Sequence, residues 1–167
     1  MTTPGSRALS RAALALAFAA CSRSMEVRST PVATVRHTGT VVVSGADGMG
    51  LTSLSVNGRA ITLTGDLVPE LQTLAGARVR VDGVAATGGA VEVRSYDVLE
   101  INGETPWVGT LVSLPDGFVL ESTGRIVVRL DAVPTALGRE TGARVWVTGT
   151  SSDGRVRVQS WGVIRSR

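Results

Sequence analysis

The sequence predicts an all-β protein that contains two tandem copies of a five-stranded barrel, with one short helix in each copy. Short stretches of alternating apolar and polar residues predict half-buried strands. Turns rich in glycine, of which the chain has 20, separate these stretches. The second half repeats the first at a spacing of roughly 65 residues, which indicates an internal duplication. A single ten-stranded β-sandwich is the alternative arrangement of the same strands.

The N-terminal segment, residues 1–20, is predicted to be a signal peptide. Arg7 and Arg11 precede an apolar, alanine-rich run that has the length of an h-region and is too short to span a bilayer. The run ends in Phe-Ala-Ala-Cys at 18–21, which resembles the lipobox of bacterial lipoproteins. The resemblance implies that Cys21, the only cysteine, carries the lipid and becomes the mature N-terminus.

The same resemblance implies a location in the bacterial cell envelope, lipid-anchored on the periplasmic side. Ser22 follows the cysteine where an Asp would direct retention, which favours the outer membrane over the inner one. Residues 21–35 are rich in Ser, Thr and Arg and are expected to form a flexible tether. Ordinary secretion after cleavage at 17–19 and a cytosolic amphipathic helix remain the alternatives for the leader.

The first repeat, residues 36–102, is expected to contain five strands and one helix. Asn57-Gly58 predicts a type I′ hairpin between the second and third strands. The leucines of 67–75 recur at helical spacing, with Asp66 as the expected N-cap and Gly76 as the stop. The strands are expected at 35–44, 50–56, 59–64, 77–84 and 91–100.

A short joint at 103–106 leads to the second repeat, residues 107–167. The pattern Gly-Ala-Arg-Val-x-Val-x-Gly at 76–83 returns at 142–149, and the helical insert is shorter. The strands of this copy are expected at 107–113, 117–122, 125–131, 143–149 and 156–165.

The last strand of each copy loses its alternation at the same place. The apolar residues shift by one position at Ser95 in the first copy and at Ser160 in the second. A β-bulge at each serine would restore a common inward face and supply the bend that a small closed barrel needs.

Three strands, a short helix and two strands form an order that resembles an OB-like barrel. Together with the Val-Asn-Gly hairpin and the glycine-bounded fourth strand, it is similar to a family of small β-barrel repeats in bacterial extracytoplasmic proteins. The resemblance covers about 37–165 and implies fold and location only, because the family has no established activity.

Nucleic-acid binding is not expected, although OB folds often serve it. Such binding uses aromatic side chains on the second and third strands, and residues 51–63 contain none. The charge is also unfavourable, because 15 arginines face 14 acidic residues once the two arginines of the leader are removed.

Enzymatic activity is not expected either, and neither is a cofactor or a metal. His37 is the only histidine and is interpreted as a solvent-facing strand residue. Asp47, Asp116 and Asp153 each directly precede a glycine and are interpreted as turn formers. The sequence contains none of the nucleophile-elbow, zinc or phosphate-loop motifs.

Trp146, Trp107 and Arg80 form the candidate interaction surface. Trp146 stands between two core valines and is predicted to point outward, where the first copy has Arg80; we expect it to pack against the other copy or a partner. Trp107 follows the joint and is expected to seal the contact between the copies. We therefore expect a membrane-anchored, non-enzymatic binding or scaffolding module for an envelope protein, peptide or glycan. The alternative is a structural accessory subunit of an envelope complex.

Overall fold

The computed structural model describes residues 33–45 and 50–167. The predicted signal peptide, Cys21 and Asp47 lie outside these residues. In the described part, no helix has the length and apolar character needed to cross a membrane.

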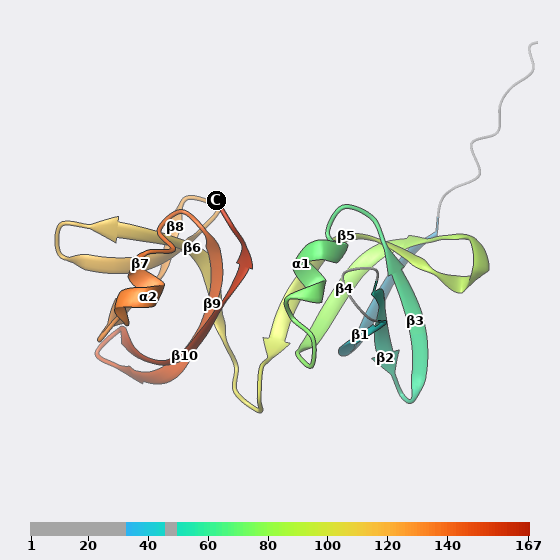
Figure 1. Cartoon of the computed structure of the whole chain (residues 1–167), viewed down its shortest axis with the longest axis horizontal. Coiled ribbons are helices and arrows are strands. Elements are labelled where there is room, and N and C mark those ends of the chain that lie inside the picture. Colours follow the sequence, from blue (N-terminus) through green and yellow to red (C-terminus); the bar gives the residue numbers. More distant parts are fainter. Residues whose placement is uncertain (1–32, 46–49) are drawn as a thin grey trace, which may run out of the picture. The chain divides into compact units, whose positions relative to one another are not determined.

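The first five strands close into a barrel (Figure 1), in the order β1-β2-β3-β5-β4, with β4 pairing back onto β1. A short helix, α1, stands between β3 and β4, and a 3-10 turn at 87–89 links β4 to β5. The elements are β1 (Thr34–Ser44), β2 (Leu51–Val56), β3 (Arg59–Thr64), α1 (Val68–Gln72), β4 (Arg78–Ala85) and β5 (Val91–Glu100).

The last five strands form a second closed barrel with the same connectivity, in the order β10-β8-β7-β6-β9. The prediction of two five-stranded, OB-like barrels is confirmed, and the single sandwich is wrong because each sheet closes on itself. The elements are β6 (Trp107–Leu114), β7 (Gly117–Ser122), β8 (Arg125–Asp131), α2 (Thr135–Gly138), β9 (Arg144–Ser152) and β10 (Arg155–Arg165).

Both predicted bulges are present. Opposite the consecutive residues Asp82 and Gly83, the partners on β5 are Ser95 and Val93, so one residue of β5 is left over. The β9–β10 pair skips one residue before Ser160 in the same way. A Cβ atom on Gly83 would overlap the carbonyl oxygen of Glu92, so the close backbone approach at the bulge requires glycine.

The hairpin and helix predictions fare differently. Asn57 and Gly58 have φ angles of 50° and 79°, as a type I′ turn requires. α1 starts after Leu67 with no side-chain cap, so the expected N-cap at Asp66 is wrong. Pro69 in the first turn, where a missing N–H costs nothing, lets the helix begin without a cap.

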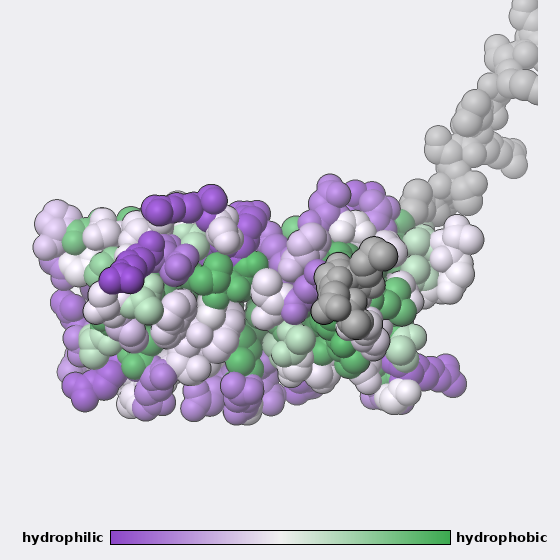
Figure 2. Space-filling model, viewed as in Figure 1, coloured by the Kyte–Doolittle hydropathy of each residue, from purple (hydrophilic) through white to green (hydrophobic). Residues whose placement is uncertain are grey.

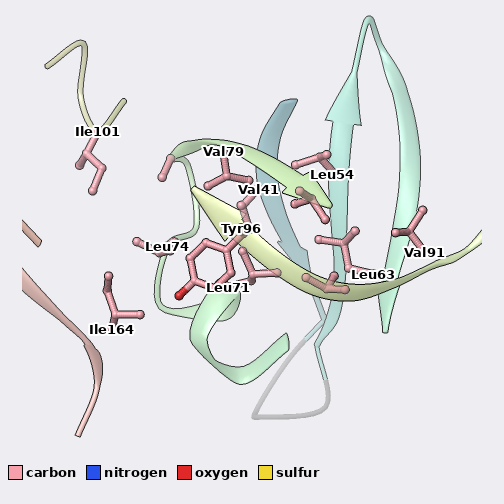
Figure 3. Packing of buried hydrophobic residues seen from close by; sticks show 13 residues of the cluster. Val41, Leu54, Leu63, Leu71, Leu74, Val79, Val91, Tyr96, Ile101 and Ile164 are labelled. Atoms are coloured by element: carbon pink, nitrogen blue, oxygen red, sulfur yellow. The ribbon is translucent and has the colours of Figure 1, made fainter. Parts of the chain in front are cut away.

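Each barrel has its own apolar core, and the first core also receives residues from the second barrel. Figure 3 shows Ile164 of β10 at the edge of the first cluster, on the side where Leu74 and Ile101 lie. Val108 and Trp146 pack against the same cluster. The copies are therefore joined by apolar contacts, as expected for units of about 60 residues that bury little core alone.

Candidate functional site

The predicted interaction surface is divided among three environments. Trp146 projects out of the second barrel, is half-buried, and packs against the cluster that combines the core of the first barrel with Ile164 of β10. Its indole covers Gly162 on the neighbouring strand, where an added Cβ would lie 2.6 Å from the indole Nε1. Trp146 is thus part of the contact between the barrels.

Arg80 and Trp107 do not join Trp146. Arg80 donates from Nη2 to Asp97 at 2.6 Å in an exposed ion pair on the first barrel. Trp107 packs against the core of its own barrel, so the expectation that it seals the contact between copies is wrong. The reason is strand alternation: Trp107 shares the inward face with Leu111, and Val108 turns toward the first barrel.

A buried carboxylate lies where the barrels meet. Glu70 on α1 is 6% exposed. Its Oε2 accepts hydrogen bonds from the Tyr96 hydroxyl at 2.5 Å and from Arg144 Nη1 at 2.8 Å. Its Oε1 accepts one from Arg165 Nη1 at 3.0 Å. These four residues, which we call the Glu70 network, link α1 and β5 to β9 and β10 of the second barrel.

The electrostatics of the Glu70 network favour a structural role. Burial raises the pKa of Tyr96, and its hydrogen bond to Glu70 raises that pKa further. The Arg144 guanidinium lies over the Tyr96 ring, 5.0 Å from its centroid. Because donors from three side chains already occupy the carboxylate, the network holds two barrels together and leaves little room for proton transfer to a substrate.

Comparison of the two copies could have revealed this network. Arg144 and Arg165 stand opposite each other on adjacent strands, and like charges at such positions repel. The matching pair in the first copy is Arg78 and Glu100, which lie 3.8 Å apart as an ion pair. The second copy therefore needs an acid from elsewhere, and Glu70 supplies it.

The second feature is a concave space of about 580 Å³ at one end of the first barrel, beside the β2–β3 hairpin. We call it the first mouth. His37 lies on the inward side of β1, opposite the buried Val81, and is half-buried. The expectation that His37 faces solvent is therefore corrected. The first mouth is lined by His37, Val56, Asn57, Arg59, Ala60 and Ile61.

The second barrel carries Trp107 where the first carries His37. Trp107 stands opposite Val147 just as His37 stands opposite Val81, and these valines are equivalent in the repeat. The indole packs on the second core. A tryptophan thus closes this end of the second barrel, whereas the smaller imidazole leaves the same end of the first barrel open.

Burial of the neighbouring strand agrees with that difference. Ile61 pairs with Leu54, and Val128 pairs with the equivalent Leu120. Val128 is 8% exposed, whereas Ile61 is only half-buried. The apolar residue at this position is buried in the second barrel and partly accessible in the first.

Other candidate groups fit a ligand less well. A groove of about 510 Å³ near the β9–β10 hairpin is lined only by polar and charged side chains. Asp116 pairs with Arg129 at 2.5 Å, and Asp153 takes a left-handed turn position with φ 51°. In the described residues no group of three His, Cys, Asp or Glu side chains could hold a metal ion.

The fold and these sites define a protein of two joined OB-like barrels, one open and one closed at equivalent ends. Comparison of the chain with protein-family models, with curated proteins and with solved structures finds no match.

Proposed function

We propose that the chain is a non-enzymatic binding module of the bacterial envelope, and that the first mouth is its binding site. The observation that carries the proposal is the exchange of His37 for Trp107 at equivalent positions, which leaves one barrel open and closes the other. Small-molecule sites are concave, largely apolar and furnished with a few polar groups, and the mouths of β-barrels are common locations.

The Glu70 network gives the second barrel a role in this proposal. Arg144 and Arg165 bind a carboxylate of the first barrel, and Ile164 completes its core. A rigid support limits the entropy that a site loses when a ligand binds. The second barrel would act as the support, and the first would act as the binder.

The membrane anchor is proposed from the sequence around Cys21. Each buried CH₂ of a lipid contributes about 0.8 kcal/mol to membrane binding, so two or three acyl chains hold a protein firmly. The mature protein should carry a mass increment of acyl groups at Cys21, and Cys21→Ala should lack it. An unmodified cysteine in wild-type protein from envelope fractions would overturn this part.

The binding site is tested by closing the first mouth. His37→Trp copies the residue that the second barrel already accommodates at this position, so the variant has a precedent within the fold. Thr38→Trp is the matched control, because Thr38 is the next residue of β1 and is exposed on the outward face.

The measurement is a screen of small molecules by heteronuclear NMR on isotope-labelled protein. We expect ligands that shift the amide signals of β1, β2 and β3 in the wild type and in Thr38→Trp, and that shift none of them in His37→Trp. If the same ligands still bind His37→Trp with unchanged affinity, the first mouth is not the site.

An accessory subunit of an envelope complex is the second candidate, and one observation favours it. On the face drawn in Figure 2, hydrophobic patches lie between hydrophilic residues on both barrels. The large exposed hydrophobic residues are Val42, Val43, Leu51, Ile126 and Val127. We expect Ile126→Ser to lose a stoichiometric protein partner. If the partner is still retained by Ile126→Ser, the apolar surface is not its binding surface.

A further inference from the structure

We infer that the first mouth takes a ligand with an apolar body and one carboxylate. This inference rests on the proposed function, because it names the ligand class of the same site. The inference is based on the chemistry of the lining residues. Some of them are apolar, the others carry nitrogen donors, and none is acidic.

The walls account for the apolar part of the ligand. Val56 and Ile61 pack against the first core and still line the space, and Ala60 stands beside them. The volume of about 580 Å³ lies within the range of roughly 300–1,000 Å³ that small-molecule sites occupy. A ligand with an apolar body would remove this apolar surface from water, which favours binding.

Arg59 accounts for the charge of the ligand. Within the described part of the chain Arg59 forms no ion pair, although it lies at the start of β3 on the rim of the first mouth. The other four arginines of the first barrel are all paired with acids. These pairs are Arg36–Asp82, Arg78–Glu100, Arg80–Asp97 and Arg94–Glu92.

A carboxylate suits the donors better than a neutral group does. The planar guanidinium of Arg59 matches the two oxygens of a carboxylate with parallel N–H donors. The His37 imidazole and the Asn57 side-chain amide add further N–H groups at the same lining. A neutral alcohol would leave most of these donors to water and would gain only from the apolar walls.

The same chemistry has two sources, a free aliphatic acid or the C-terminal residue of a peptide with an apolar side chain. Octanoate represents the first and N-acetyl-leucine the second. Octanol is the neutral probe that shares the apolar body of octanoate. Comparing the three separates the contribution of the charge from that of the apolar surface, and it separates the two sources.

Isothermal titration calorimetry on the full chain carrying Cys21→Ala, which has no thiol for lipid attachment, measures the three affinities. We expect octanoate to bind about tenfold or more tightly than octanol, the ratio that one charge-assisted hydrogen bond supplies. Arg59→Gln should reduce this ratio to about one while octanol binding stays unchanged. Arg125→Gln is the matched control, because Arg125 opens the equivalent hairpin strand of the second barrel.

Failure of the inference and failure of the proposed function give different results. Equal affinities for octanoate and octanol, or an Arg59→Gln variant that keeps the preference, overturn the carboxylate and leave the first mouth as a site. Absence of binding by octanoate and by N-acetyl-leucine also overturns the inference. Binding that survives His37→Trp overturns the proposed function itself. Circular dichroism of each variant confirms that the two barrels are folded before binding is compared.

Discussion

Replacing Glu70 by Gln is predicted to destabilise the protein by about 2–2.5 kcal/mol. The glutamine has nearly the same shape, so packing on α1 is conserved and the lost quantity is the negative charge. The charge is buried, with a residue exposure of 6%, and three donors converge on it. The perturbation therefore tests whether the Glu70 network is what joins the barrels.

The magnitude follows from the exposure of the partners. A hydrogen bond to a charged group contributes about 1.5–3 kcal/mol and a neutral one about 0.5–1.5, so the Tyr96 bond weakens by about 1 kcal/mol. Arg144, with a side chain 29% exposed, contributes about 1 kcal/mol more. Arg165 is 64% exposed and solvated, so its pair contributes at most about 0.5 kcal/mol.

Equilibrium unfolding in urea, followed by far-UV circular dichroism because all three tryptophans lie in the second barrel, measures the difference. The free energy of unfolding should fall by the stated amount, and the single transition should broaden as the barrels begin to unfold separately. Glu92→Gln is the control, because Glu92 pairs with Arg94 at the surface and should cost less than about 0.5 kcal/mol. If Glu70→Gln costs no more than Glu92→Gln, the carboxylate does not hold the barrels together.

Three further predictions concern the same fold. Folding raises the pKa of Tyr96, the only tyrosine. The stability that this shift contributes is complete below the unfolded pKa of about 10 and is lost as the pH rises above that value. The free energy of unfolding should therefore fall at alkaline pH, and Tyr96→Phe should abolish that fall. Gly149→Ala should destabilise by about 1–3 kcal/mol in urea, since its Cβ would overlap the Arg157 carbonyl oxygen. In Gly154→Ala the Cβ meets no neighbour, so this variant should show only the backbone strain of its φ of 73°. Trp107→His should lower the unfolding free energy by about 2–4 kcal/mol through the cavity it opens in the second barrel, and an unchanged melting temperature would show that the indole is not packed there.

The strands and the bulges could be predicted from the sequence because their causes are local. Alternation with a period of two reports which side of a strand is buried, and Asn57-Gly58 reports a turn that almost only such residues form. The slip before Ser160 was visible because the same slip occurs before Ser95. Because the chain is duplicated, each of these local patterns occurs twice, and the second occurrence supports the interpretation of the first.

The Glu70 network could not be predicted from local patterns. Glu70 is separated from Arg144 by 74 residues and from Arg165 by 95, and no periodicity relates them. The helix cap failed for a different reason: Asp66 lies one residue before the true N-cap position, so its side chain does not reach the first free amides. Tertiary contacts and single-residue shifts decide such features.

His37 shows what can be learned by comparing equivalent positions of the two repeats. Considered alone, a lone histidine on a polar strand gives no reason to assign a site. Placed against Trp107, it marks an inward position where the first copy has the smaller side chain. In the second barrel the indole of Trp107 packs on the core and occupies the space that a ligand would need at this end. This difference between the copies supports the proposal that the first barrel binds the ligand and the second barrel supports it.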